Sequence, residues 1–298
     1  MPMPADVQDR KIHNSFKLTK VGVKDVRKPV RVRRDGKSLT LTATFDIFVD
    51  LPASQKGSHL SRNLEIVAEI VNESVRSPMP GLEFAAEKIA VELLNRHSYA
   101  SNSEVWARAE YFLERTGPGG RKSLEPYELV AKAWAHRNKP IAVCKAIGVK
   151  VVGMTACPCA METVRHELTS RKPALAKQCG DIPMISHNQR NRTTLMLEVP
   201  EEAEVEANDL VELVESSLSS PTYGILKRKD EGNVVLNAHR NPKFVEDVVR
   251  DILGKLLKKY KDLDDSVHVT VRSVSEESIH KHNALAERVT TLGELRKK

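Results

Sequence analysis

A run of alternating apolar and polar residues between positions 39 and 49 constrains the fold more than any other stretch. The apolar members take the odd positions: Leu39, Leu41, Ala43, Phe45, Ile47 and Val49. The polar members take the even positions: Thr40, Thr42, Thr44 and Asp46. A period of two is the repeat of a strand with one buried face. The pattern therefore predicts a long, half-buried strand that ends at Leu51-Pro52.

The segments around this strand predict the order strand, strand, helix, helix, strand, strand for the first half of the chain. Alternating valines predict an extended segment over 16–34, and Asp35-Gly36 after it is a hairpin signal. Residues 1–14 are polar and carry no pattern, so we expect them to be poorly ordered. Two helices and two further strands are predicted at 60–75, 82–97, 104–115 and 127–136.

The second half repeats this order without repeating the sequence. Predicted strands cover 141–156, 193–199 and 267–274, and predicted helices cover 161–176 and 208–219, the latter capped by Asn208-Asp209. A further helix is expected to open at Asn241-Pro242, with Asn as the cap and Pro in the first turn. Strands and helices do not alternate as βαβ units, which argues against a doubly wound parallel sheet. We predict an α+β fold of two modules, 1–139 and 140–298.

Composition narrows the setting in which such a chain works. The 298 residues are 40% hydrophobic and carry a net charge of +7, which suits an anionic partner or simply a solvated basic surface. No apolar run approaches the roughly 20 residues of a membrane span, and the N-terminus lacks a secretion signal. Four cysteines are too few for a disulfide framework, so we expect a cytoplasmic protein without membrane contact. Cys144 and Cys179 have the character of incidental buried residues.

Cysteines and histidines gather at three places. Gly153-Met154-Thr155-Ala156-Cys157-Pro158-Cys159-Ala160 follows an apolar run, and on a strand its two thiols would face one pocket. Ser186-His187-Asn188-Gln189-Arg190 and Ile279-His280-Lys281-His282 add three imidazoles, the last two on one predicted strand face. The grouping suggests an open metal site, which keeps three protein ligands. The simpler interpretations are two buried thiols, a structural histidine and two exposed histidines.

Three charged segments could bind an anion or a base. Lys227-Arg228-Lys229-Asp230-Glu231 is either a phosphate-binding and metal-binding loop or a solvated one. Lys56-Gly57-Ser58-His59-Leu60-Ser61-Arg62 opens a helix, where backbone N–H groups favour anions. Glu246 is either the i,i+4 partner of Arg250 or a carboxylate that accepts hydrogen bonds from a guanine-like edge.

Taken together, these motifs resemble the archaeal branch of the type IB GTP cyclohydrolases. The match runs in family order over nearly the whole chain and includes three more segments: Ser220-Pro221-Thr222-Tyr223, Asn241-Pro242-Lys243-Phe244-Val245-Glu246-Asp247 and Ser278-Ile279-His280-Lys281-His282. Two departures from the bacterial relatives stand out. The 30 residues from Cys157 to His187 form a longer gap, which fits the archaeal branch. Leu60 stands where relatives often carry Met.

The resemblance implies a tunnelling fold, in which modules of antiparallel strands and paired helices assemble into barrels. It implies a homo-oligomer, a dimer or tetramer, with sites between subunits. It also implies ferrous iron, with zinc or manganese in bacterial relatives. By the same resemblance Cys157, His187 and Glu231 are the metal ligands.

The resemblance assigns the other site residues as well. Glu246 is the guanine anchor. The catalytic residues, besides Cys157, are Cys159, His280 and His282. The remaining substrate contacts are His59, Arg62, Lys227 and Arg228, and of these the resemblance assigns Arg62, Lys227 and Arg228 to the phosphates.

The implied reaction converts GTP to 7,8-dihydroneopterin 2',3'-cyclic phosphate with release of formate and pyrophosphate, the first step of methanopterin biosynthesis. The alternative within the family is 7,8-dihydroneopterin triphosphate. Two interpretations from other classes remain: a basic nucleic-acid-binding protein and a dithiol redox protein built on Cys157 and Cys159. The aromatic content of 4% argues against base stacking, so we expect no nucleic-acid partner.

Overall fold

The computed structural model describes residues 8, 13–34, 36–171, 182–200 and 203–297. Its contacts divide the chain into two compact units. Unit 1 comprises Met1–Tyr111, Leu129–Ile147 and Glu198–Glu204, and unit 2 comprises Phe112–Glu128, Gly148–Leu197 and Val205–Lys298. The dividing points fall inside strands, because long strands take part in both units. The division of the sequence into modules at 139/140 stays a prediction.

Unit 1 is built on the predicted order of elements. It contains β1 (Leu18–Arg34), β2 (Lys37–Leu51), α1 (Leu60–Arg76), α2 (Leu82–Arg96) and parts of β3 (Asn102–Thr116), β4 (Lys122–His136) and β5 (Ala142–Ala156). β1 pairs with β2, and β2 with β3, both antiparallel. Gly36 in the β1–β2 turn has φ of 72°, which glycine adopts without strain. Asp35 and most of residues 1–14 lie outside the described residues.

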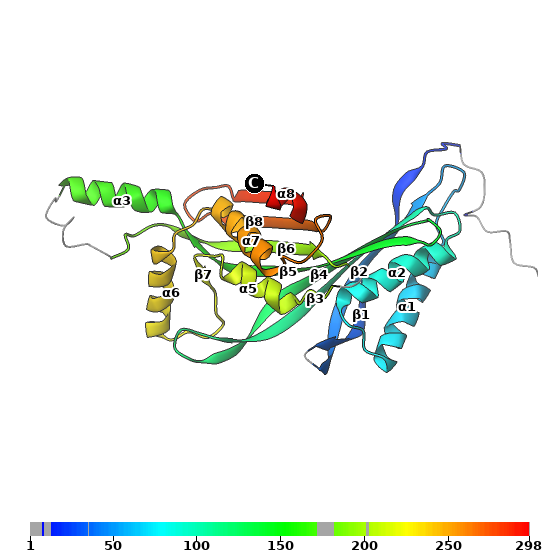
Figure 1. Ribbon diagram of the computed structural model, residues 1–298, viewed down its shortest axis with the longest axis horizontal. Coiled ribbons are helices and arrows are strands. Elements are labelled where there is room, and N and C mark those ends of the chain that lie inside the picture. Colours follow the sequence, from blue (N-terminus) through cyan, green and yellow to red (C-terminus); the bar gives the residue numbers. More distant parts are fainter. Residues whose placement is uncertain (1–7, 9–12, 35, 172–181, 201–202, 298) are drawn as a thin grey trace, which may run out of the picture. The chain divides into compact units, whose positions relative to one another are not determined.

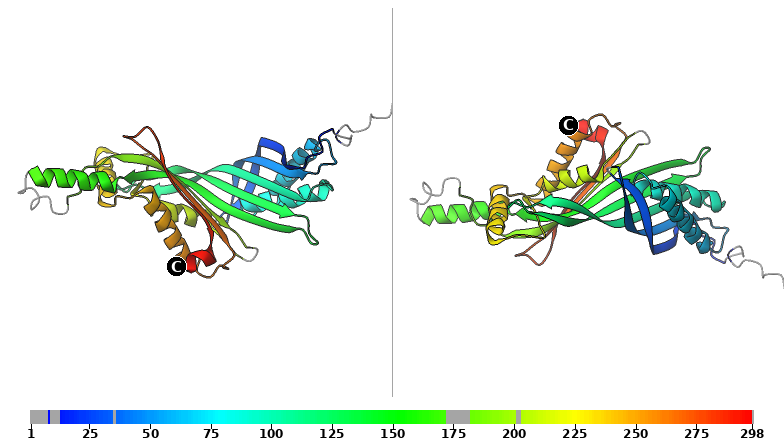
Figure 2. Two further views of the ribbon diagram at one scale, coloured as in Figure 1. Left: turned by 90° about the horizontal axis from the view of Figure 1, so that it is seen from above. Right: turned by 90° about the horizontal axis from the view of Figure 1, so that it is seen from below.

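The core of unit 1 lies between its strands and its two helices. α1 and α2 lie side by side against one face of β1 and β2 (Figures 1 and 2). The alternation in β2 is confirmed, since Phe45 and Ile47 are fully buried while Thr44 and Asp46, which precede them, are half-buried. Ile66 of α1 and Ile89 of α2 close the same core.

Unit 2 holds the remaining strands and helices. They are α3 (Pro158–Arg171), β6 (Asn188–Glu198), α5 (Ala207–Glu215), β7 (Ser220–Pro221), α6 (Arg228–Arg240), α7 (Val245–Lys259), β8 (His268–Glu276), β9 (Ala284–Thr291) and α8 (Leu292–Arg296). Within the described residues the strands run β1-β2-β3-β4-β5-β6-β8-β9, with β7 beside β5. β6–β8 and β8–β9 are antiparallel pairs. α7 packs on β8 and β9, and α5 packs on α7. The α+β class is confirmed.

One helix was not predicted, and one predicted start is wrong. Residues 228–240 form α6, although the segment 227–231 was expected to be a loop; few of its residues face a core, so its apolar pattern is weak. Asn241 does not open a helix. Its N–H bonds to the carbonyls of Asn237 and Ala238, and so it ends α6. α7 begins at Val245, where an Asp247 carboxylate oxygen accepts the Phe244 N–H at 3.0 Å.

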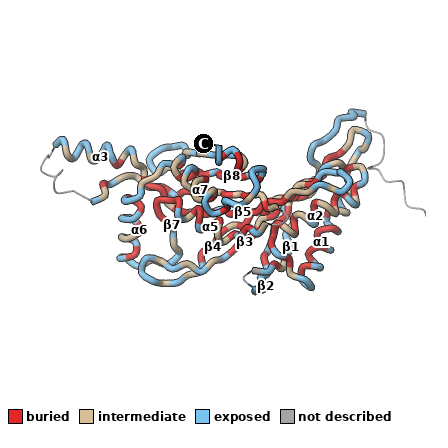
Figure 3. Tube along the Cα trace, in the orientation of Figure 1, coloured by how far each residue is buried: buried red, intermediate tan, exposed pale blue. Residues whose placement is uncertain are grey.

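Three further expectations about local structure are corrected. Cys159 is not on a strand with Cys157, because Pro158 is the first residue of α3, a position that suits proline. His280 and His282 lie in the turn between β8 and β9, and β9 itself was missed. α5 begins at Ala207 and ends at Glu215, so Asn208-Asp209 lies inside its first turn. α3 is mostly exposed (Figure 3), and residues 172–176 of its predicted extension lie outside the described residues.

Candidate active site

A pocket of about 220 Å³ in unit 2 collects five of the eleven predicted site residues. Four chain segments supply its lining: the end of β5, the start of β6, the start of α7 and the β8–β9 turn. Its ionisable side chains include one thiol, three imidazoles and two carboxylates, namely Cys157, His187, His280, His282, Glu246 and Glu277.

Backbone hydrogen bonds hold the first of these segments together. The Cys157 N–H donates to the His187 carbonyl at 3.1 Å, and the Ser186 hydroxyl donates to the Cys157 carbonyl at 2.6 Å. The Lys243 N–H donates to the Ala156 carbonyl at 3.0 Å, which brings the approach to α7 to the same point. Segments distant in sequence thus meet around Cys157 through hydrogen bonds that each involve a main-chain carbonyl.

The two cysteines differ in their surroundings. Cys157 is half-buried and lines the pocket, and its Sγ accepts the Ala160 N–H from the first turn of α3 at 3.5 Å. The thiolate is the form of a cysteine side chain that binds metals. Cys159 is exposed and does not line the pocket. The structure therefore separates the pair that the sequence placed together.

His187 has a defined tautomer. Its Nδ1 lies 3.1 Å from Oε1 of the buried Gln189, and an amide oxygen can only accept a hydrogen bond. Nδ1 therefore carries the hydrogen, which leaves the lone pair on Nε2 for a metal. A Glu277 carboxylate oxygen lies 3.7 Å from the same Nδ1.

The two histidines of the β8–β9 turn stack on each other beside His187. The ring centroids of His280 and His282 are 5.2 Å apart and nearly parallel. The rings of His187 and His280 are perpendicular, with centroids 6.2 Å apart. Three imidazoles thus form a continuous group, which is an arrangement suited to proton transfer near neutral pH.

A buried polar network supports the pocket floor. Ser275 lines the pocket, and its hydroxyl lies 3.2 Å from that of Thr155. Asn191 donates to the hydroxyls of Ser273 and Ser275 at 2.9 and 3.2 Å, and Thr193 donates to Ser273 at 2.9 Å. All five side chains are nearly inaccessible to solvent. A fully bonded network of this kind holds β5, β6 and β8 in one arrangement.

Glu246 is the second residue of α7 and lines the pocket with an exposed side chain. Arg250, its alternative partner by sequence, pairs instead with Asp247 at 3.5 Å. Glu277 was missed as a candidate. The signal was available, since Glu277 directly precedes the Ser278–His282 motif, but a lone glutamate at a strand end carries no pattern of its own.

The structure places Lys227, Arg228 and Glu231 around the first turn of α6, with exposed side chains, and none of them lines the pocket. The other end of α6 reaches the pocket region, where Nε2 of His239 lies 3.2 Å from the Ser186 carbonyl. Eight residues separate Glu231 from His239, or about 12 Å along a helix at 1.5 Å per residue. The structure thus does not bring Glu231 together with Cys157 and His187.

The remaining predicted residues, His59 and Arg62, belong to unit 1. His59 is the residue before α1, and Arg62 lies in the first turn of that helix. Arg62 donates one hydrogen bond to the Arg96 carbonyl at 3.3 Å. Both side chains are half-buried.

The donor set of the pocket fits a transition metal, since thiolate, imidazole and carboxylate ligands suit iron, zinc and manganese. Among the described residues, however, no three Cys, His, Asp or Glu side chains lie close enough to hold one ion.

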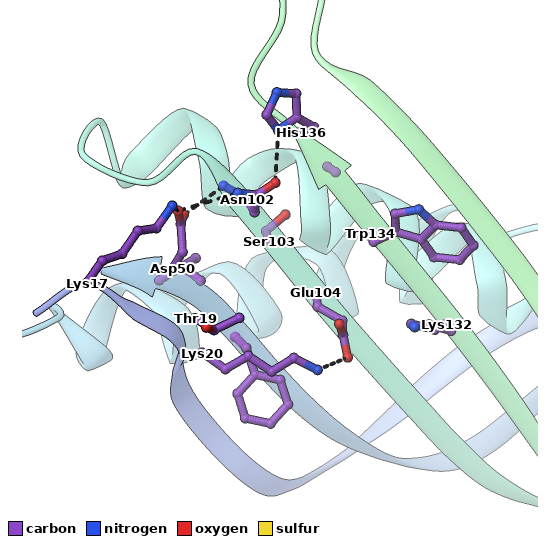
Figure 4. A pocket seen from close by; sticks show the side chains of 13 residues that line it. Lys17, Thr19, Lys20, Asp50, Asn102, Ser103, Glu104, Lys132, Trp134 and His136 are labelled. Carbon is purple, nitrogen blue, oxygen red and sulfur yellow. Dashed lines mark hydrogen bonds and ion pairs between the residues drawn. The ribbon is translucent and has the colours of Figure 1, made fainter. Parts of the chain in front are cut away.

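A second, larger hollow lies in unit 1, with a volume of about 550 Å³ (Figure 4). Its charged groups pair with one another: Lys17 with Asp50 at 2.8 Å, and Lys20 with Glu104 at 2.7 Å. Lys132 Nζ lies 4.7 and 5.1 Å from the ring centroids of Trp106 and Trp134. The sequence did not single out these residues.

Comparison with known proteins decides the family. Residues 4–286 match the family model described as type I GTP cyclohydrolase folE2. The chain belongs to the type I GTP cyclohydrolase family. This cyclohydrolase is 42% identical to the GTP cyclohydrolase MptA of Methanosphaera stadtmanae, over 98% of the present chain and 96% of the relative. It is also 42% identical to the GTP cyclohydrolase MptA of Methanothermobacter thermautotrophicus, over 98% and 94% of the two chains.

Solved structures place the cyclohydrolase in a wider fold group. It superposes on a hyper-thermostable uricase mutant with a TM-score of 0.52 at 7% identity, over 92% of each chain. A uricase from Bacillus fastidious gives a TM-score of 0.50 at 10% identity, over 94% and 96%. At such identities the likeness concerns the fold alone. No helix in the described part of this cyclohydrolase is long and apolar enough to cross a membrane.

Proposed function

We propose that the unit 2 pocket is where this cyclohydrolase opens the purine ring of GTP. The observation that carries the proposal is the convergence of a thiol, three imidazoles and two carboxylates from four segments, in a chain of this family. A hydrolysis at a purine carbon needs an activated water, a guanine anchor and groups that move protons, and these residue types supply all three.

Cys157 and His187 would hold a divalent metal, which by the resemblance is ferrous iron, with zinc or manganese as alternatives. When bound, such a metal lowers the pKa of a water ligand toward neutrality. Glu231 is the third ligand that the resemblance implies. Glu277 is a second candidate, because its carboxylate already lies within the pocket beside His187.

The side chains of the pocket then have separate roles. The Glu246 carboxylate accepts hydrogen bonds from the guanine edge. His280 and His282 move protons to and from the opening ring, and Cys159 joins them if α3 brings it near the bound substrate. His59, Arg62, Lys227 and Arg228 contact the phosphates.

Water attacks C8 of the guanine and opens the imidazole ring to a formamide, and a second water hydrolyses the formamide to release formate. The ribose rearranges and a pterin ring closes with loss of one water, so that one water is consumed overall. The expected product is 7,8-dihydroneopterin 2',3'-cyclic phosphate, with pyrophosphate released, as the first step of methanopterin synthesis. Support comes from the long segment between Cys157 and His187 and from relatives at 42% identity that carry the MptA name. The alternative product is 7,8-dihydroneopterin triphosphate.

We further propose a homo-oligomer, dimer or tetramer, of the tunnelling-fold type, working in the cytoplasm, with site residues drawn from more than one chain. The uricase-like fold supports this, and so do β1 and β9 at the two ends of the described strand order. Sedimentation measured alongside activity over a range of dilutions tests it, because specific activity should fall as the oligomer dissociates.

The reaction itself is tested by anaerobic incubation with GTP and ferrous iron, followed by mass spectrometry of the product. Formate and pyrophosphate should appear in equal amounts per GTP consumed, and exposure to air should abolish the activity. Formate without pyrophosphate would establish the triphosphate product. Neither product with any of the three metals would contradict the proposed function.

A further inference from the structure

Four side chains of unit 1, those of Ser58, Asn63, His97 and Tyr99, form a hydrogen-bonded chain that begins within residues 56–62. The proposed chemistry uses none of the four. Ser58, Asn63 and His97 are buried, with 7%, 0% and 0% of their surface exposed. Tyr99 is half-buried. Ser58 lies two residues before α1 and Asn63 lies in the first turn of that helix, whereas His97 and Tyr99 follow the end of α2.

The distances define a continuous chain with a direction. The Tyr99 hydroxyl lies 2.9 Å from the Ser58 hydroxyl and 2.8 Å from His97 Nδ1, and His97 Nε2 lies 2.7 Å from Asn63 Oδ1. Burial, then the nearby charges of Arg62 and His59, lower the pKa of His97 to about 4, so its ring is neutral at pH 7.

A neutral imidazole has one donor and one acceptor. Because the Asn63 oxygen only accepts, His97 Nε2 donates to it, and Nδ1 accepts from the Tyr99 hydroxyl. The Tyr99 oxygen is then left to accept from Ser58. The Tyr99 hydroxyl is therefore the one group that joins the 56–62 segment to the end of α2 through this chain.

Two more contacts connect the 56–62 segment to the end of α2 and the turn after it. The Tyr99 ring lies between two histidine rings, with centroid distances of 5.4 Å to His97 and 6.3 Å to His59. Arg62 donates to the carbonyl of Arg96, the last residue of α2. His59 and Arg62, the two residues of this segment assigned to the substrate, thus both rest on the end of α2 and the turn after it.

We propose that Tyr99, oriented by His97, is a positioning residue that holds the 56–62 segment in the shape that receives the triphosphate. This inference rests on the proposed function, in which His59 and Arg62 contact phosphates. Charged side chains bind an anion well only when their geometry is held in advance. Loss of the Tyr99 hydroxyl releases Ser58 and His97 together and leaves the ring in place, so it should weaken phosphate binding without touching the purine end.

The test is calorimetric binding of inorganic tripolyphosphate and, separately, guanosine to the metal-loaded, full-length enzyme under anaerobic conditions. Tyr99→Phe should weaken tripolyphosphate binding about fivefold to tenfold, the worth of one or two net hydrogen bonds, and leave guanosine binding unchanged. Tyr260→Phe is the matched control, because the buried Tyr260 hydroxyl has no hydrogen-bond partner in the described structure. Ser58→Ala should reproduce the Tyr99→Phe effect and add little to it in the double variant.

The other outcomes overturn the proposal in distinguishable ways. If Arg62→Gln weakens tripolyphosphate binding and Tyr99→Phe does not, the positioning role is wrong while the phosphate contact stands. If neither variant has an effect, the phosphate contact fails and the positioning role fails with it. If Tyr99→Phe weakens tripolyphosphate and guanosine binding equally, Tyr99 is only a structural residue.

Discussion

The unit 2 pocket and the unit 1 hollow both contain charged side chains, but they use them differently. In the hollow, Lys17 and Lys20 lie within 2.8 and 2.7 Å of their carboxylate partners. In the pocket, His187 Nδ1 lies 3.7 Å from a Glu277 carboxylate oxygen, and the histidine rings are more than 5 Å apart. Apart from Lys243, whose ammonium pairs with Asp251, the groups of the pocket are thus less tightly paired than those of the hollow.

This difference indicates which of the two cavities is suited to chemistry. Burial alone would raise the pKa of Asp50 in the hollow, but hydrogen bonds from Lys17, Asn102 and Ser101 lower it below its ordinary 3.8. A carboxylate that is hydrogen-bonded in this way stabilises the strands and is not available to an outside ligand. The groups of the pocket are held through their main chains instead, which leaves thiol and imidazole atoms available to an outside ligand.

The largest difference in activity between a variant and the parent enzyme is expected when a proposed metal ligand is removed. Cys157→Ala and His187→Ala should each abolish turnover and bound metal, because neither leaves an open site with three ligands. Cys144→Ala should change neither, since Cys144 lies in unit 1 outside the pocket. Metal analysis beside initial rates checks this, and full metal occupancy in either ligand variant would remove that residue from the set.

Glu246→Gln should separate purine recognition from metal binding within the same pocket. A site built to accept guanine N–H groups loses up to about 10⁴-fold in turnover when the match fails, while metal content and fold remain. Steady-state kinetics with GTP checks it. Normal GTP turnover in this variant would leave Glu246 as an exposed residue of the α7 first turn.

The two carboxylate candidates should differ in their effect on metal affinity. If Glu277 is the third ligand, Glu277→Gln should weaken metal binding by more than about 100-fold, beyond what loss of an outer-shell partner costs, and Glu231→Gln should have a smaller effect. If Glu231 is the ligand, the order reverses. Competition with a chelator of known affinity measures both variants, and equal, unchanged affinities would exclude both residues.

The smallest effect is expected in the unit 1 hollow, and on stability rather than activity. Asp50→Asn should lower the free energy of unfolding by about 2 kcal/mol at pH 7. The amide oxygen can still accept from the Ser101 and Asn102 N–H groups, but the buried charge and the second oxygen, which faces Lys17 and the Asn102 side chain, are lost. The pKa of Asp50 is lower in the folded state, so its contribution is present above about pH 4 and is lost as the pH falls through the folded value. The gap between variant and parent should therefore close in acid, as urea unfolding curves would show. A gap that does not narrow as the pH is lowered through the acid range would contradict this.

Periodicity predicted the regular part of the fold well. β2 and the pair α1 and α2 follow directly from alternating and helical spacing, since each buries one continuous apolar face. α6 could not be predicted in this way, because its helix buries few residues and is closed at its start by Asp230, which accepts the Lys227 N–H. At Cys157-Pro158-Cys159 the strand pattern was extended past the end of β5 at Ala156, because proline ends a strand and opens a helix equally well.

The site was predicted in composition but not in arrangement. Motifs named Cys157, His187, Glu246, His280 and His282, and the structure places all five in one pocket. The contacts that assemble them are backbone bonds such as Cys157 N–H to the His187 carbonyl, which leave no trace in residue type. Glu277 and Tyr99 are likewise identified only by their tertiary neighbours, so no spacing rule could select them.

The central proposal is that Cys157 is a metal ligand in the unit 2 pocket. Replacing the native metal with cobalt(II) under anaerobic conditions tests this without any turnover, because a thiolate bound to cobalt gives an intense charge-transfer absorption. The parent enzyme and Cys159→Ala should show the band, and Cys157→Ala should lack it. A band that persists in Cys157→Ala and disappears in Cys159→Ala would contradict the account.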